Sequence, residues 1–185
     1  MLKEKLKGRL VKTIISPSEA LKNSGVQGAI LSMDASWYRT MDGDKELVEL
    51  ASFAFLVSRG GDPLQVEVEF EKGEFKTKQQ DLSKELGPVK EEEGFLNQVK
   101  LVNDAAIIEK LEKNARVKTV MRKAKHLRVA SMSFVLFDEV YEAPVWQVVL
   151  KNGDLTKYFK TEKPMTAEVT LEAVRGNVLS FRQVI

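Results

Sequence analysis

The sequence predicts an α+β fold built from two similar halves, each with a helix followed by an antiparallel meander of strands. Apolar and polar residues alternate along several segments, as they do in strands with one buried face. Glycine-containing turns separate those segments. A helix-start signal precedes the strands in both halves, at Ser16 and at Asn103. A helix covering one face of an antiparallel sheet accounts for all three observations.

The expected domains are an N-terminal α+β half at residues 1–80, a charged linker at 81–100 and a C-terminal α+β half at 101–185. The linker is rich in Lys and Glu, poor in apolar residues, and interrupted by Gly87 and Pro88, and we expect it to be partly helical. Because the order of elements recurs while identity between the halves is low, we infer an internal duplication of structure. Whether the halves share one sheet or form separate domains stays open.

The composition indicates a folded protein and excludes some chemistry. Hydrophobic residues make up 43% of the chain and charged residues 30%, which excludes disorder, and the net charge of +2 gives no whole-molecule attraction to nucleic acid or membranes. The absence of cysteine excludes disulfides, thiolate zinc sites and cysteine nucleophiles. No apolar run matches a signal-peptide core or a membrane span. As given, the sequence predicts a cytoplasmic protein, or an exported one if a leader was removed.

In the first half we expect a helix and then a meander of strands. Leucines at four-residue spacing predict one side of a further helix within residues 1–15. Ser16 can cap the next helix, because Pro17 suits a first turn and Glu19 stands three residues after the cap. This helix should end near Asn23. Strands are expected at 29–38, 46–58, 64–70 and 74–78, with turns at 40–44, 60–63 and 72–73.

In the second half Asn103 can cap a helix that runs to about Asn114. The segment 116–128 is either a second helix or a basic strand. Asn152 and Gly153 form the strongest hairpin signal in the chain, since both residue types tolerate positive φ. Strands are expected at 129–140, 145–150, 155–159, 165–173 and 177–184. Within the first of these, Phe134 and Phe137 are three residues apart and should face opposite sides of the sheet.

The last predicted turn, at Arg175 and Gly176, separates two alternating runs. Gly176 supplies a backbone angle that a residue with a Cβ atom would resist. A register slip would turn the apolar side chains outward, so this stretch is expected to specify the fold. The candidates for its buried face are Leu171, Ala173, Val178 and Phe181.

Two segments of the second half carry a family resemblance. Trp146 begins a valine-rich strand in Val145–Val148, and the closing turn reads EAVRGNVL over residues 172–179. With the preceding helix, these segments resemble the PepSY family of small domains, mainly over 101–185 and more faintly over 16–78. Glu172 departs from the family's usual aspartate, so the role of that acid in shaping the turn does not carry over. The resemblance implies a non-catalytic module, often outside the cytoplasm, of a kind proposed to bind or inhibit peptidases.

The residues reveal no dedicated reaction centre, so we expect no catalytic residue, no cofactor and no metal site. His126 is the only histidine, and the basic residues around it would discourage a cation. A general base also needs a partner residue that positions it, and the sequence shows no such residue for His126. Nucleophile-elbow, phosphate-loop and dinucleotide motifs are absent. Glu67 and Glu69 fall on the wet face of a strand; a solvated surface is the ordinary interpretation there, and an acid–base pair stays open.

The most uneven charge feature is the stretch 113–128, which contains seven Lys and Arg and no acid. A solvated basic face, paired in part with Glu91–Glu93, is the ordinary interpretation, since such surface pairs contribute only ~0–1 kcal/mol each. A docking patch for an anion, nucleic acid or acidic partner is the alternative, although the stretch lacks aromatic residues for base stacking. The candidate patch consists of Lys113, Arg116, Lys118, Arg122, Lys123, Lys125 and Arg128.

Three functional hypotheses follow. The leading one is a non-enzymatic binding or interaction module, PepSY-like in character, whose partner is another protein. The second is a small-ligand-binding or enzymatic domain with its site in the cleft between the two halves, where sites often form. The third is anion or nucleic-acid docking through 113–128, with nucleic acid the less favoured partner. Homo-oligomerisation through a sheet edge is a further expectation.

Overall fold

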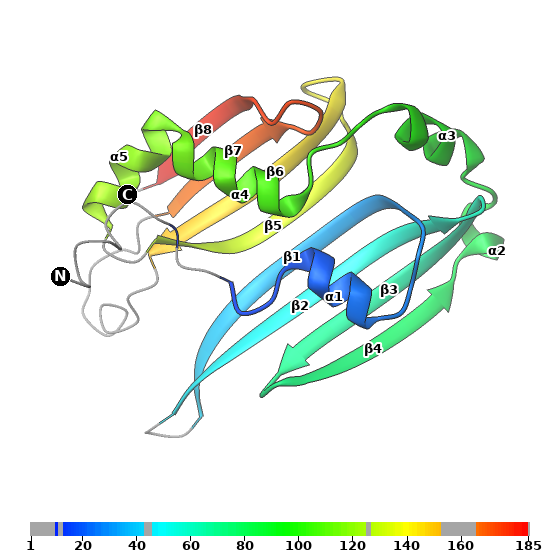
Figure 1. The fold of residues 1–185 in the computed structure, drawn as a ribbon, viewed down its shortest axis with the longest axis horizontal. Helices are drawn as coiled ribbons and strands as arrows, with labels where there is room; N and C mark the ends of the chain where they lie inside the picture. Colours follow the sequence, from blue (N-terminus) through cyan, green and yellow to red (C-terminus); the bar gives the residue numbers. More distant parts are fainter. Residues whose placement is uncertain (1–9, 11–12, 43–45, 125–126, 153–165, 185) are drawn as a thin grey trace.

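The computed structural model describes residues 10, 13–42, 46–124, 127–152 and 166–184. Over these residues the chain is an α+β protein with one eight-stranded antiparallel sheet and five helices (Figure 1). This architecture confirms the predicted α+β class with antiparallel strands. None of the described helices is long and apolar enough to cross a membrane.

All eight strands lie in a single sheet in the order β4-β3-β2-β1-β5-β6-β7-β8. Their bounds are β1 Ala29–Asp42, β2 Glu46–Arg59, β3 Asp62–Glu71, β4 Glu74–Asp81, β5 Leu127–Asp138, β6 Ala143–Asn152, β7 Thr166–Glu172 and β8 Val178–Val184. The two meanders meet where residues 32–36 of β1 pair with 131–135 of β5. We call this β1–β5 junction the seam. The halves therefore share one sheet, which the sequence had left open.

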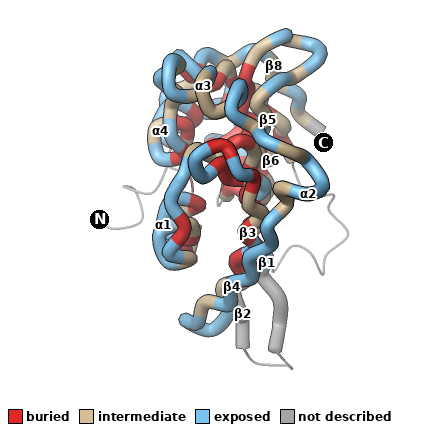
Figure 2. Tube along the Cα trace, turned by 90° about the vertical axis from the view of Figure 1, so that its right-hand side faces the viewer, coloured by how far each residue is buried: buried red, intermediate tan, exposed pale blue. Residues whose placement is uncertain are grey.

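The described residues form five helices, some of which lie over one face of this sheet. The helices are α1 Pro17–Asn23, α2 Ser83–Leu86, α3 Lys90–Gln98, α4 Asp104–Lys113 and α5 Ala115–Lys123. Figures 1 and 2 place α1 and α4 on the same side of the strands, α1 over the first meander and α4 over the second. α3 and α5 lie at opposite ends of the molecule (Figure 1).

The predicted helix starts are confirmed. The Ser16 hydroxyl accepts a hydrogen bond from the Glu19 amide at 3.1 Å, and the Glu19 carboxylate accepts one from the Ser16 amide at 2.9 Å, which completes a capping box. The Asn103 side chain caps α4 by accepting a hydrogen bond from the Ala106 amide at 2.9 Å. The segment 116–128, predicted as either helix or strand, begins as α5, because the side chain of Asn114 accepts hydrogen bonds from the first amides of that helix.

The core lies between the helices and the sheet, and Figure 2 shows buried residues gathered there. Alternate side chains of β2 face it, so that Phe53, Phe55 and Val57 are at most 1% exposed. From the helical layer, Ile107 and Val117 are fully buried. Burying one such side chain stabilises the fold by about 1.5–3 kcal/mol. Helix–sheet packing is therefore the main source of stability.

The other face of the sheet is more polar, as the alternation predicts. Glu67 and Glu69 are exposed on β3. Phe134 is 3% exposed and Phe137 is 62% exposed, which confirms that the two rings face opposite ways.

Several predicted boundaries are wrong. Residues 40–42 of the predicted turn continue β1, and the remainder of that turn includes residues that lie outside the described ones. The turn at 60–63 is shorter than predicted, because Asp62 and Pro63 already pair with β2. Proline is tolerated there because it stands at the start of the strand. The segment 81–100, predicted as a partly helical linker, does contain two helices: after the last residue of β4 it forms α2 and α3.

Other predictions fall outside the described residues. They are the strand at 155–159, Gly153 of the hairpin signal, and most of the helix expected within 1–15. His126 lies outside them as well.

The closing hairpin confirms the conformational role of Gly176, whose φ is +70°. A Cβ atom there would lie 2.2 Å from Cδ of Lys110 on α4. Leu171 and Ala173 are fully buried, while Val178 and Phe181 pack half-buried against the core. The hairpin thus carries apolar contacts between β7, β8 and the helical layer.

Candidate functional site

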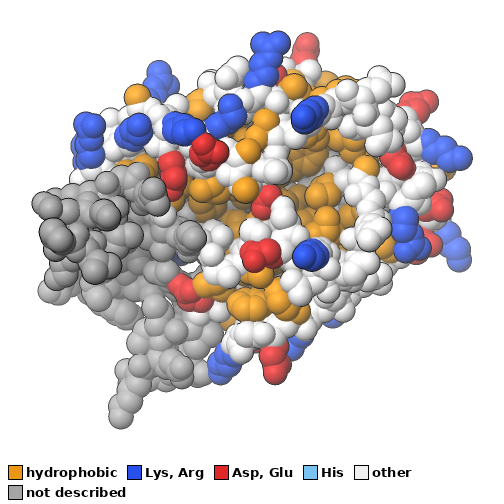
Figure 3. Space-filling model, viewed as in Figure 1, with side chains coloured by type: hydrophobic (Ala, Val, Ile, Leu, Met, Phe, Trp, Pro, Cys, Tyr) orange, Lys and Arg blue, Asp and Glu red, His pale blue; other side chains and the backbone are white. Residues whose placement is uncertain are grey.

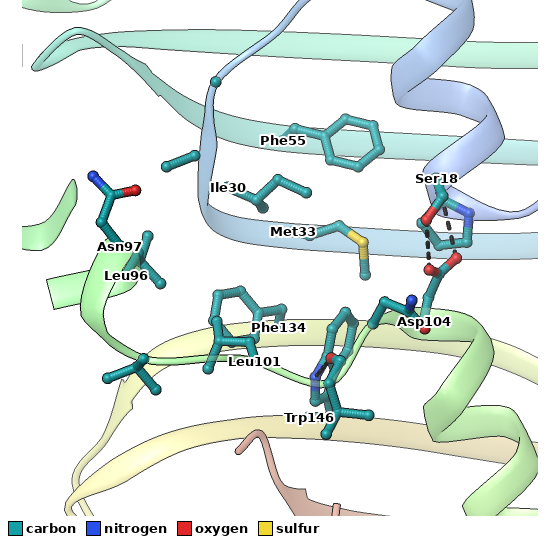
Figure 4. Close-up of a pocket in the computed structure, with 16 residues that line it drawn as sticks. Ser18, Ile30, Met33, Phe55, Leu96, Asn97, Leu101, Asp104, Phe134 and Trp146 are labelled. Carbon is teal, nitrogen blue, oxygen red and sulfur yellow. Dashed lines mark hydrogen bonds between the residues drawn. The ribbon is translucent and has the colours of Figure 1, made fainter. Parts of the chain in front are cut away.

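A pocket of about 400 Å³ lies at the seam, between α1 on one side and the segment from α3 to α4 on the other (Figure 4). We call it the seam pocket. Figure 3 shows hydrophobic side chains at the bottom of a hollow on this face of the molecule. The residues that define the pocket below are Met33, Phe55, Leu96, Asp104, Phe134 and Trp146.

The floor of the seam pocket is a row of apolar side chains that crosses four strands. Phe55 of β2 pairs with Met33 of β1, Met33 pairs with Phe134 of β5, and Phe134 pairs with Trp146 of β6. Partners in adjacent strands point to the same face, so the four side chains stand side by side. The rings of Phe134 and Trp146 are 5.2 Å apart between centroids. Both halves therefore contribute to one continuous floor.

Trp146 also holds the segment that leads into α4. Its indole Nε1 donates a hydrogen bond to the carbonyl of Val102 at 3.1 Å. In the first half, Trp37 Nε1 likewise donates to the carbonyl of Ile15 at 2.8 Å, just before α1. Each indole fixes the chain one residue before a helix N-cap. The entrances of α1 and α4, which flank the pocket, are thereby tied to the sheet.

Asp104 is the buried polar group of the pocket wall, with 5% of its surface exposed. One of its oxygens accepts a hydrogen bond from the Ser18 hydroxyl at 2.5 Å, and the other accepts one from the Ser18 amide at 3.3 Å (Figure 4). A carboxylate in the first turn of α4 is also favoured by the helix dipole. This pair joins the N-terminal turns of α1 and α4 across the seam.

The end of α3 closes another side of the pocket with Leu96 and Asn97 (Figure 4). No residue of the helix is fully buried, although Leu96 packs against the core, and polar contacts add to its attachment. The Glu93 carboxylate accepts hydrogen bonds from the buried Ser58 hydroxyl at 2.5 Å and from the Gly61 amide at 2.7 Å. Glu93 therefore anchors this wall to the turn between β2 and β3.

The chemistry of the described lining is simple. The aromatic and aliphatic floor meets one carboxylate, from Asp104, and the amides of Asn97 and Asn103. None of the described lining residues is lysine, arginine or histidine. The described residues also contain no group of three or more acidic or histidine side chains placed to hold a metal ion. Such a lining can enclose an apolar group and receive hydrogen bonds at its edge.

The candidate basic patch is only partly assembled. Arg116, Lys118, Arg122 and Lys123 are exposed on α5, and Lys113 ends α4. Arg128 lies on β5 and not on α5; it is half-buried, and its Nη1 donates to the carbonyl of Trp37 at 3.0 Å. Lys125 lies outside the described residues.

The predicted pairing of this patch with the acidic stretch Glu91–Glu93 is wrong. That stretch begins α3, which lies at the other end of the molecule from α5 (Figure 1). A local partner exists instead, because Lys113 pairs with Glu109 one turn earlier on α4. The hydrogen bond from Lys113 and its positive charge lower the pKa of Glu109.

Sequence reasoning missed the residues of the seam pocket. Phe55, Phe134 and Trp146 were assigned to core packing, and Asp104 was interpreted only as part of a helix start. Their contact depends on the pairing of β1 with β5, strands about a hundred residues apart along the chain, which no local pattern encodes. The sequence feature that came closest to indicating the pocket was Trp146, near the start of β6.

Comparisons with known proteins leave the family open. No family model matches the chain. No curated protein matches it. Among solved structures, the fold is similar to that of a "putative lipoprotein" from Clostridium difficile 630, with 10% sequence identity and a TM-score of 0.45 over 94% of this chain and 96% of the other.

Proposed function

We propose that this protein is a non-enzymatic binding module that takes a small, largely apolar ligand in the seam pocket. The observation that carries the proposal is the row Phe55, Met33, Phe134 and Trp146, which opens into a pocket of about 400 Å³. A pocket of that volume falls in the range of small-molecule sites, about 300–1,000 Å³. Side chains of this kind on a sheet are normally covered by a helix. Here each of the four is at most 7% exposed, and together they line the space between α1 and α4.

The tethers around the pocket support a preformed site. Trp37 and Trp146 fix the two helix entrances, the contact between Ser18 and Asp104 joins them, and Glu93 anchors α3. A site held in this way loses little conformational entropy when a ligand enters. Binding therefore does not require the pocket to be assembled first.

We also propose that the two halves arose by duplication of a helix-plus-meander unit of PepSY-like character. The support is the order of elements: in each half a helix capped by a polar side chain precedes four strands. The strands of the two halves run outward from the seam in mirror order, β1 to β4 and β5 to β8. On this proposal the pocket lies at the junction of the two units.

The test is a titration of the protein with N-phenyl-1-naphthylamine, a probe whose fluorescence rises in apolar sites. The matched pair of variants is Leu96→Trp, which fills the pocket from α3, and Phe95→Trp, which alters the neighbouring side chain, 42% exposed. We expect saturable binding to the wild type and to Phe95→Trp. Leu96→Trp should weaken binding about tenfold or more, since the added ring occupies the ligand's volume.

The proposal is wrong if the folded wild type does not bind the probe saturably. It is also wrong if both variants bind the probe as the wild type does, because the probe would then sit elsewhere. Circular dichroism of each variant checks that its secondary structure is unchanged.

A second candidate function is anion docking on α5. Four cations are exposed on that helix and it carries no acid, while its other face is buried through Val117, Val120 and Met121. An exposed basic face of this kind attracts polyanions in a salt-dependent way. Retention on a heparin column should fall when Arg122 and Lys123 are both replaced by Gln. Equal retention of the double variant and the wild type would remove this candidate.

Self-association through the β8 edge is a further proposal for the partner. Leu179 on this edge is 40% exposed, whereas the opposite edge, β4, carries Lys76 and Lys78, which discourage strand pairing. Multi-angle light scattering should then give the mass of a dimer for the wild type and of a monomer for Leu179→Lys. A monomeric wild type would contradict it.

A further inference from the structure

The seam pocket combines aromatic rings with a single carboxylate, and this combination favours a positively charged ligand. Phe55, Phe134 and Trp146 present ring surfaces, and the electron-rich face of an aromatic ring attracts a cation within about 6 Å. Among the described lining residues, the only side chain that carries a full charge is Asp104. An anionic ligand would bring a second negative charge into a poorly hydrated space.

Asp104 retains hydrogen-bonding capacity toward a ligand. Ser18 supplies one donor to each carboxylate oxygen, and each such oxygen can accept two hydrogen bonds. Figure 4 shows Asp104 at the end of the pocket where Ser18 lies. A positive group at this end would lie near the carboxylate, while the apolar part of the ligand would cover the aromatic floor.

We infer that the seam pocket selects a small organic cation, an amine or quaternary ammonium attached to an apolar group, over neutral and anionic ligands of the same shape. The inference rests on the proposed function and specifies its ligand class. The apolar floor supplies affinity through buried area, and the carboxylate with the aromatic rings supplies charge selectivity.

The experiment is a displacement of bound N-phenyl-1-naphthylamine from the wild-type protein by three ligands of one shape. They are benzyltrimethylammonium, its neutral isostere neopentylbenzene, and the anion phenylmethanesulfonate. We expect the cation to displace the probe at a concentration about tenfold lower than the neutral isostere does. The anion should be the weakest of the three.

The variant Asp104→Asn tests the origin of that selectivity. It should reduce the advantage of the cation over the neutral isostere to about twofold. The readout is the ratio of the two displacement concentrations on the same variant, so a general loss of affinity does not affect it. If this variant does not fold, the ranking of the three ligands on the wild type decides the matter alone. Equal displacement by all three ligands, or stronger displacement by the anion, would overturn the inference and leave the proposed function standing. If the probe does not bind at all, both are overturned.

Discussion

At the scale of single residues, the pair of Ser18 and Asp104 carries both structure and proposed function. Asp104 is 5% exposed, so its carboxylate depends on protein donors. Its two hydrogen bonds from Ser18 join residues 86 positions apart. The same carboxylate lines the pocket. A buried polar group that is satisfied by one neighbour makes that neighbour important for stability.

Replacing Ser18 by Ala should lower the free energy of unfolding by about 1–3 kcal/mol, because a buried carboxylate loses a donor. The matched control is Ser83→Ala, whose hydroxyl donates to Asp81 over the same 2.5 Å but at the surface. The control should change stability by less than about 0.5 kcal/mol. Urea denaturation followed by circular dichroism measures both, and equal effects would refute the structural role of the buried pair.

The capping box of α1 should make the free energy of unfolding depend on pH in the acidic range. Hydrogen bonds from the Ser16 amide and hydroxyl lower the pKa of Glu19 in the folded protein. The ionised Glu19 carboxylate therefore stabilises the fold above the ordinary glutamate pKa, and this stabilisation is lost as the pH falls through the lowered pKa of the folded state. Glu19→Gln can keep the hydrogen bonds without titrating. Its stability should fall less steeply than that of the wild type between about pH 5 and pH 2. The free energy of unfolding is measured by urea denaturation at each pH, and Glu91→Gln controls for the change in net charge. If the stability of Glu19→Gln and of the wild type falls equally steeply with acid, this prediction is contradicted.

At the scale of elements, the entry into β1 is the most constrained point near the pocket. Gly28 has a φ of +153°, and a Cβ atom there would lie 2.3 Å from the carbonyl oxygen of Ser58 and 2.6 Å from Val57 Cγ1. Neither backbone nor a β-branched side chain can move aside cheaply. The close approach lets β1 start against β2 beneath the pocket.

Gly28→Ala should therefore destabilise the protein by at least about 3 kcal/mol, through backbone strain and steric overlap together. Gly25→Ala provides the comparison, because its φ of +71° carries a similar conformational penalty while nothing lies within 4 Å of the added atom. That control should lose about 1 kcal/mol. Thermal denaturation of the two variants measures the difference. If they melt together, β1 does not need this close approach.

Local signals predicted the elements well and their contacts poorly. Ser16 and Asn103 mark helix starts through side-chain chemistry that acts within one turn, so the sequence sufficed there. Alternation predicted that Phe134 and Phe137 face opposite sides, and the structure buries Phe134 and exposes Phe137. The seam pocket was missed because it depends on which strands become neighbours, and Met33 meets Phe134 only through the β1–β5 pairing. The basic run crosses from α5 into β5 without a change in composition, so the sequence did not reveal that Arg128 lies on a different element from the other cations.

At the scale of the whole molecule, the shared sheet should make the two halves unfold together. The pairing of β1 with β5 is continuous with both meanders, and the core beneath α1 is continuous with that beneath α4 and α5. A domain with one core and no internal boundary unfolds in one cooperative step.

The two tryptophans report separately on this cooperativity, since Trp37 lies on β1 and Trp146 on β6. In each single-tryptophan variant, Trp146→Phe and Trp37→Phe, the fluorescence midpoint in urea should coincide with the circular dichroism midpoint of the same variant. Separate midpoints in either variant would indicate that the halves unfold independently.

The location of the ligand is the central claim, and methionine methyl groups test it most directly. Met33 lines the seam pocket, whereas Met121 is buried under α5. In protein labelled with ¹³C at the methionine methyls, saturation with N-phenyl-1-naphthylamine should shift the Met33 resonance through the ring current of the probe and leave that of Met121 in place. An unmoved Met33 resonance at saturation, or a shift of Met121 of the same size, would contradict the account.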